Sequence, residues 1–187
     1  MEKQIAIIGA GISGLLACKY TLSKGFHPIV FEAKSSIGGV WTNTVETTKL
    51  QTPKPFYQFS DFPWPESVTE VFPNQHQVCD YVQSYAEHFD LLKHIRFNSK
   101  VLAINYEGPS NEEMQCWSSW GGDGEAFSSR GKWKVEVQDT YSLKYEVCKK
   151  HKILFNVCTS IVLRFKKLIK NTGIPSGFYD PLCRAVQ

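Results

Sequence analysis

The sequence GAGISG at residues 9–14 constrains the fold of this chain more than any other feature. The apolar run Gln4–Ile8 precedes it and suits a central parallel strand that is covered on both faces. From Ile12 onward the apolar residues recur at helical spacing, and Gly25 stands where a helix commonly ends. A second apolar run follows at residues 28–32. The order strand, glycine loop, helix, strand predicts a βαβ unit that binds a dinucleotide.

Each glycine of the loop has its own mechanical role in such a unit. Gly9 makes the tight turn, Gly11 lets the backbone approach a pyrophosphate, and Gly14 lets the helix pack closely on the strand. The pyrophosphate would lie at the helix N-terminus, where amide groups lack intrahelical partners. Glu32 ends the second strand, where a carboxylate accepts hydrogen bonds from ribose hydroxyls and repels a 2′-phosphate. We therefore expect FAD or NAD here rather than NADP.

A second pair of glycines, Gly38 and Gly39, follows shortly after Glu32. By itself the pair fits an ordinary glycine turn, but it also permits a backbone to approach a ligand closely. Together with Glu32 it forms the pattern ExxxxxGG, which is common in flavoproteins that have two dinucleotide domains. This pattern favours FAD over NAD.

Composition and charge exclude several other classes of protein. The first residues could pass as a secretory signal, but no convincing cleavage site follows, and no stretch is long enough to span a bilayer. The six cysteines form no CxxC pair, so we expect reduced thiols and a cytoplasmic protein. The five histidines show no metal-ligand spacing, so we expect no metal site.

The charge is distributed unevenly along the 187 residues. Residues 1–148 hold 13 basic and 17 acidic side chains, whereas residues 149–187 hold 8 basic side chains and one acidic side chain. A basic tail can bind nucleic acid or an anionic membrane surface. No aromatic platform or recognition-helix pattern accompanies these charges, so we expect no nucleic-acid partner.

The remaining elements can be read from apolar spacing and turn residues. Residues 52–65 are rich in proline and aromatic residues, which predicts a packed irregular loop. A helix should begin near Pro73, with its aromatic residues facing the core, and residues 100–106 and 132–137 alternate like strands. The glycine-rich and serine-rich segment 108–131 reads as a loop. The apolar segment 153–163 is either a buried strand or an aggregation-prone exposed stretch.

Seven segments, taken in order, resemble the flavin-containing monooxygenases and most closely their plant members. The matching segments are GAGISG at 9–14, FEA at 31–33, GGVW at 38–41, LQTPK at 50–54, SDFPWP at 60–65, YAEHFDLLK at 85–93 and KWKV at 132–135. They lie between residues 9 and 135 at the spacing of that family, within a resemblance that covers about 147 residues. The fold class implied is α/β, a Rossmann-like three-layer FAD/NAD(P)-binding fold with a parallel central sheet, here incomplete.

The resemblance also implies a cofactor, a reaction and a set of contacts. It implies FAD reduced by NADPH, and oxygenation of a soft nitrogen or sulfur nucleophile, such as an amine or sulfide, through an FAD hydroperoxide. The cofactor performs this chemistry, so no catalytic side chain is implied. Gln51 takes the place of an asparagine that lies near the flavin in many animal members. The expected cofactor-binding residues are Gly9, Ala10, Gly11, Ser13, Gly14, Glu32, Gly39, Val40 and Trp41.

The chain also departs from the family pattern. It lacks a second GxGxxG for NADPH and is about a third as long as two dinucleotide-binding domains require. We expect an FAD-binding domain over residues 1–148 and a divergent basic tail over 149–187, as in a truncated, alternatively spliced or mispredicted gene product. Two functions remain open. The chain is either part of an FAD- and NADPH-dependent monooxygenase that is inactive alone, or a catalytically inactive FAD-binding fragment or regulatory partner of a full-length relative.

Overall fold

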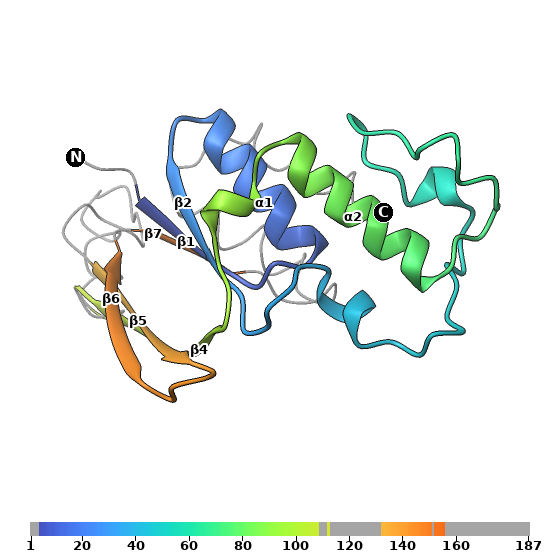
Figure 1. Cartoon of the computed structure of the whole chain (residues 1–187). Coiled ribbons are helices and arrows are strands. Elements are labelled where there is room, and N and C mark those ends of the chain that lie inside the picture. The colour runs from blue at the N-terminus through green and yellow to red at the C-terminus, as the bar shows by residue number, and fades with distance from the viewer. Residues whose placement is uncertain (1–3, 109–111, 113–131, 151, 156–187) are drawn as a thin grey trace.

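The computed structural model describes residues 4–108, 112, 132–150 and 152–155 (Figure 1). The segment GGDG at 121–124 and the tail beyond residue 155 lie outside the described residues, so the expectations made for them are not addressed. The elements, in chain order, are β1 (Gln4–Ile8), α1 (Ile12–Ser23), β2 (His27–Phe31), η1 (Gly39–Thr42), η2 (Lys54–Phe56), α2 (Gln75–His88), η3 (Leu92–His94), β3 (Ile95–Arg96), β4 (Ser99–Glu107), β5 (Lys132–Asp139), β6 (Tyr145–Lys150) and β7 (Lys152–Phe155), where η marks a short 3-10 helix.

The central sheet is parallel, as the sequence predicts, with the strand order β3-β2-β1-β7. In this register Ile5 lies opposite Pro28 on one side and Lys152 on the other. The strand β7 takes up the first part of the apolar segment 153–163, so this part forms a strand of the sheet. It lies beyond residue 148, where the sequence suggested a domain boundary.

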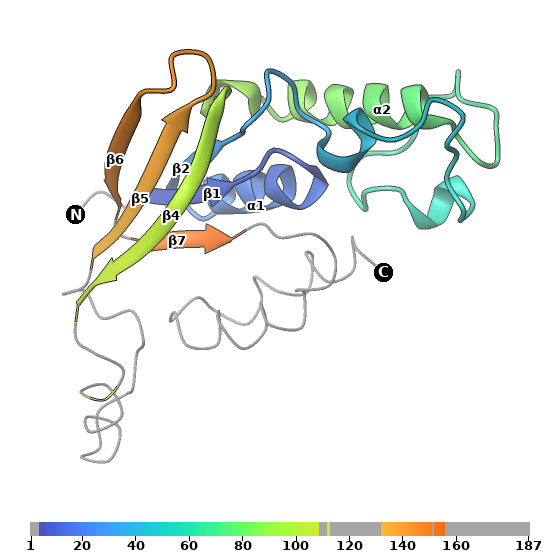
Figure 2. The ribbon, with the colours of Figure 1, turned by 90° about the horizontal axis from the view of Figure 1, so that it is seen from below.

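The parallel sheet separates two layers of apolar side chains, because alternate residues of a strand point to opposite faces. Ile5 and Ile7 of β1 belong to a core that includes residues of α1 and α2. Ala6 between them belongs to a second core with Phe31 and Val135. Figures 1 and 2 show the outcome, with the helices on one side of the parallel sheet and β4, β5 and β6 on the other. The predicted three-layer Rossmann-like architecture is therefore confirmed.

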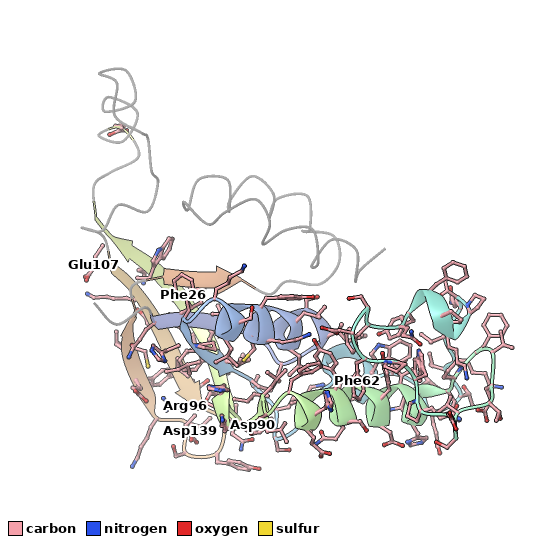
Figure 3. All side chains as sticks on the ribbon, turned by 90° about the horizontal axis from the view of Figure 1, so that it is seen from above. Phe26, Phe62, Asp90, Arg96, Glu107 and Asp139 are labelled. Atoms are coloured by element: carbon pink, nitrogen blue, oxygen red, sulfur yellow. The ribbon has the colours of Figure 1, made fainter. Side chains whose placement is uncertain are left out.

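The outer layer is an antiparallel sheet with the strand order β4-β5-β6. Both predicted strands in this region exist, and each runs two residues longer than expected. A β-bulge between Val101 and Ala103 shifts the register of β4 against β5. Arg96 at the end of β3 donates to Glu146 of β6 over 2.6 Å, and this ion pair raises the pKa of the guanidinium. Arg96 lies close to Asp139 (Figure 3), and its ion pair with Glu146 joins the outer sheet to the central one.

The helix α2 begins at Gln75, two residues after Pro73, and its start is fixed by a capping box. The side chain of Asn74 accepts from the Gln77 amide over 3.0 Å, and the side chain of Gln77 accepts from the Asn74 amide over 2.9 Å. These two bonds satisfy amide groups that a helix start leaves without intrahelical partners.

The aromatic loop at residues 52–65 is packed, as predicted, and the structure places it against α2. The hydroxyl of Tyr81 accepts from the Phe59 amide over 2.9 Å and donates to the Phe62 carbonyl. The ring of Trp64 stacks on Tyr81 at 4.0 Å between centroids. Phe62 packs among aromatic side chains beside α2 (Figure 3). Within the described residues, no helix is long and apolar enough to cross a membrane.

Candidate dinucleotide site

The glycine loop connects the carboxyl end of β1 to the start of α1. Gly9 has a φ of 86°, a conformation that side chains disfavour, and its amide donates to the Phe31 carbonyl over 2.8 Å. This bond joins the loop to the end of β2. The position predicted for the tight turn is therefore the position where the backbone turns.

The residue Gly11 is the N-cap of α1 and has no side chain to cap the helix. Ser13 and Gly14 follow in the first turn, where Ser13 is half-buried and Gly14 is buried. The first amides of any α-helix lack intrahelical carbonyl partners, and the helix dipole favours an anion beside them. This end of α1 thus offers the geometry that a phosphate group requires.

The backbone of Gly11 does not itself require glycine. Its φ of −76° and ψ of −179° are accessible to any residue, and an added Cβ would meet the Cα of Gly39 at 3.5 Å, an ordinary contact distance. The described chain could therefore accommodate alanine at this position. A side chain would instead occupy the space in front of the helix, where a ligand would lie.

The second glycine pair packs directly against the first loop. The Gly38 amide donates to the Ala10 carbonyl over 3.1 Å. Gly39 has a φ of 60°, and a Cβ there would come within 3.0 Å of the Cα of Gly11. Two glycine turns far apart in sequence therefore form one interlocked surface, which the sequence did not predict.

The carboxylate of Glu32 lies beside this surface, at the end of β2. It is 7% exposed, and its two oxygens accept from the amides of Ala10 over 2.6 Å and of Lys34 over 2.9 Å. A carboxylate has about four acceptor positions, so it retains capacity for two ribose hydroxyls. Its negative charge next to the loop opposes a ribose that carries a 2′-phosphate.

The segment η1 carries Val40 and Trp41 next to the glycine surface. Val40 is 67% exposed, and Trp41 is half-buried. The Trp41 indole donates to the Tyr57 hydroxyl over 2.6 Å, and the Gln75 side chain donates to the Trp41 carbonyl over 2.7 Å. Of the expected residues, the structure thus gathers Gly9, Ala10, Gly11, Ser13, Gly14, Glu32, Gly39, Val40 and Trp41 around one end of the parallel sheet.

Sequence reasoning missed three residues that support this region. The amine of Lys34 donates to the Thr42 hydroxyl over 2.8 Å and to the Gly39 carbonyl over 3.4 Å. Tyr57 and Gln75 hold Trp41 from two other elements. The spacing of a sequence shows no such contact, because each partner comes from a separate segment.

The tyrosine side chains of α2 belong to the core. Tyr85 of α2 is fully buried, and burial raises the pKa of its hydroxyl. Phe89 packs against Tyr85 at 4.8 Å between ring centroids, so both aromatic residues face the core as predicted. Within the described residues, no group of three or more acidic, histidine or cysteine side chains is placed to hold a metal ion.

A glycine loop at a helix start, an acidic residue at the end of the next strand and a parallel sheet define the class: a dinucleotide-binding α/β protein. The chain belongs to the flavin-binding monooxygenase-like family, which it matches over residues 2–157. The match continues past residue 148 and includes β7.

Individual relatives agree with this assignment. The chain is 44% identical over 139 residues to the probable flavin-containing monooxygenase 1 of Arabidopsis thaliana. The match covers 73% of this chain and 26% of the relative. It is 40% identical over 114 residues to human flavin-containing monooxygenase 1, and this match covers 56% of this chain and 21% of the relative. The chain therefore spans about a quarter of the length of these relatives.

Solved structures share the fold at lower identity. The S-allyl-L-cysteine S-oxygenase of Allium sativum superposes with a TM-score of 0.65 at 19% identity, over 81% of this chain and 35% of that protein. Cyclohexanone monooxygenase of Rhodococcus sp. Phi1 bound to NADP+ superposes with a TM-score of 0.61 at 23% identity, over 82% of this chain and 25% of that protein. These likenesses support the three-layer fold described above.

Proposed function

We propose that this chain is the FAD-binding part of a flavin-dependent monooxygenase and is inactive without the rest of such an enzyme. The observation that carries the proposal is Gly11. Neither its backbone angles nor its neighbours in the chain exclude a side chain, whereas a pyrophosphate at the N-terminus of α1 would. Family membership supports a flavin as the dinucleotide.

Each part of the site has a role in holding FAD. The amides at the start of α1 would bind the pyrophosphate, and Glu32 would accept the ribose hydroxyls. Gly39, Val40 and Trp41 would flank the cofactor. Bound FAD, reduced by NADPH, supplies the oxygenating chemistry toward an amine or sulfide. The protein's role is to bind the cofactor, orient it and exclude water.

The proposal is tested by adding FAD to the purified chain and measuring absorbance between 400 and 500 nm and the dissociation constant. We expect a yellow complex. Gly11→Ala should keep the unfolding temperature of the FAD-free chain and weaken FAD binding by at least about tenfold, because a methyl group fills the phosphate approach.

Gly25→Ala is the matched control. Gly25 has a φ of 72° with nothing within 4 Å of an added Cβ, and it lies at the far end of α1. The substitution should lower stability by about 1 kcal/mol through backbone strain and leave FAD affinity unchanged. A colourless wild-type chain that takes up no FAD would reject the proposal, as would equal affinity in Gly11→Ala.

A second candidate function, association with a family-length relative, is supported by exposed apolar side chains. Phe56 is 76% exposed and Val71 is 56% exposed, and the Lys54 amide joins their segments by donating to the Val71 carbonyl over 2.8 Å. Exposed apolar patches mark interaction surfaces. The partner we propose is a family-length relative, of which this chain matches about a quarter.

This candidate is tested by mixing the chain with a purified family-length relative, followed by size-exclusion chromatography and measurement of NADPH oxidation. Co-elution that Phe56→Ser abolishes is the expected result. The chain alone should oxidise no NADPH. Separate elution at micromolar concentration would rule the association out.

We further propose a cytoplasmic location and a single FAD-binding domain that extends to β7, with a divergent basic tail after it. The described cysteines Cys18 and Cys79 are free thiols, which suits a reducing compartment. The pairing of β7 with β1 supports the later boundary.

A further inference from the structure

Two groups from distant elements hold Trp41 in place. The hydroxyl of Tyr57, which follows η2, accepts the indole N–H over 2.6 Å, and the two rings meet edge to face at 5.9 Å between centroids. Gln75, the first residue of α2, donates its amide to the Trp41 carbonyl over 2.7 Å. We call Tyr57, Gln75 and Trp41 together the Trp41 clamp.

The clamp holds a segment that contains no fully buried residue. Val40 is 67% exposed, whereas Trp41 is half-buried and packs against the core of the helical layer. The turn that leads into the segment has positive φ at Gly38 and Gly39, which glycine adopts without strain. The position of η1 therefore depends on how Trp41 is held.

The position of η1 matters because its first residue touches the glycine loop. A Cβ on Gly39 would lie 3.0 Å from the Cα of Gly11, so a small displacement of η1 changes the space in front of α1. Lys34 anchors the same segment locally, through Thr42 and the Gly39 carbonyl. Lys34 precedes η1 in the sequence. The clamp adds restraint from two residues that follow η1, Tyr57 after η2 and Gln75 at the start of α2.

We propose that Tyr57 and Gln75 are positioning residues for the cofactor: they hold η1 at the distance from the glycine loop that a bound dinucleotide requires. The proposal rests on the proposed FAD-binding function and deepens it. Neither residue needs to touch FAD. Burial raises the pKa of Tyr57 to about 12, so its hydroxyl stays neutral and available to the indole at any physiological pH.

The variants Tyr57→Phe and Gln75→Ala test the clamp, and Tyr81→Phe and Gln83→Ala are their matched controls. Tyr81→Phe removes a hydroxyl that bonds to the same aromatic loop but not to η1. Gln83→Ala removes an exposed side-chain bond to Glu87 on the same helix as Gln75. Three measurements are made on each variant: the dissociation constant for FAD, the visible circular dichroism of bound FAD, and amide hydrogen exchange of the FAD-free chain.

We expect Tyr57→Phe and Gln75→Ala each to weaken FAD binding about fivefold to tenfold and to alter the visible circular dichroism of the flavin. Without FAD, exchange should accelerate at residues 39–43. Tyr81→Phe should lower the unfolding temperature more than Tyr57→Phe does and leave FAD affinity unchanged. In a Trp41→Phe background, Tyr57→Phe should have no further effect, because its partner is gone.

The outcomes separate this proposal from the proposed function. A wild-type chain that binds FAD, with Tyr57→Phe and Gln75→Ala binding as tightly as the controls, overturns the clamp alone. If the losses of FAD affinity caused by Trp41→Phe and by Tyr57→Phe add up in the double variant, the clamp is overturned as well. A wild-type chain that binds no FAD overturns the proposed function, and it also overturns the proposed role of the clamp in cofactor binding.

Discussion

At the scale of single residues, burial decides which polar groups are available for chemistry. Glu32 is buried, yet both carboxylate oxygens have amide donors, so its charge is stabilised beside the glycine loop. Cys18 is buried in the core of the helical layer, and burial raises the pKa of its thiol from 9.0 to about 12. Cys79 is half-buried, and burial raises the pKa of its thiol as well, although by less.

This difference predicts the reactivity of the thiols. Since the thiolate is the nucleophile, Cys18 should react with iodoacetamide at pH 8 about a thousandfold more slowly than an unperturbed cysteine, and more slowly than Cys79. Peptide mass spectrometry after timed labelling measures both rates. In denaturant the two cysteines should react equally, which serves as the control. Fast labelling of Cys18 in the folded chain would contradict its burial.

At the scale of elements, local sequence signals and distant contacts contribute differently to α2. The sequence predicts its start near Pro73, before an apolar stripe, and the helix begins at Gln75. Its partner, the aromatic loop, depends on tertiary contacts. The sequence predicts that the loop packs, because proline prevents a long helix, but not that Tyr81 bonds to it twice.

The capping box predicts a specific loss of stability. Asn74→Ala should lower the free energy of unfolding by about 1 kcal/mol, because the Gln77 amide loses its acceptor at a helix start. Urea denaturation followed by circular dichroism measures the change. Asn74→Asp keeps the acceptor and should restore stability to near the wild-type value. An equal loss of stability in Asn74→Ala and Asn74→Asp would show that Asn74 does not act as the acceptor for the Gln77 amide.

At the scale of the whole molecule, one sheet is shared by two cores. The strand β1 contributes Ile5 and Ile7 to the core with the helices and Ala6 to the core with the outer sheet. If either core loses its packing, it exposes one face of the parallel sheet, and the other core packs on the opposite face of the same sheet. The described layers should therefore unfold together.

This sharing predicts cooperative unfolding in variants of either core. Leu16→Ala in the helical layer should cost about 2–5 kcal/mol, and Val137→Ala in the outer sheet about 1–3 kcal/mol. In both variants, the transitions seen by far-ultraviolet circular dichroism and by tryptophan fluorescence should coincide. If the helices of Val137→Ala instead unfold in a separate transition, after the outer sheet has unfolded, the two layers are independent units.

Short-range patterns predicted much of the fold and part of the site. The βαβ unit, both later strands and the helix near Pro73 follow from apolar spacing and turn residues, which act within a few residues. The interlocking of Gly11 with Gly39 and the bonds from Tyr57 and Gln75 to Trp41 do not, because they join segments whose proximity only the folded chain establishes.

The strand β7 has a consequence for how the chain is made. Ile5 pairs with Lys152, so one side of the first strand finds its neighbour only after residue 152 has been synthesised. At synthesis rates of about 5–20 residues per second, that edge of β1 remains open for on the order of ten seconds. A nascent chain with an unpaired, apolar β1 is a substrate for chaperones and a template for misassembly. We therefore expect the speed of translation between β1 and β7 to affect how much of this protein reaches its folded state.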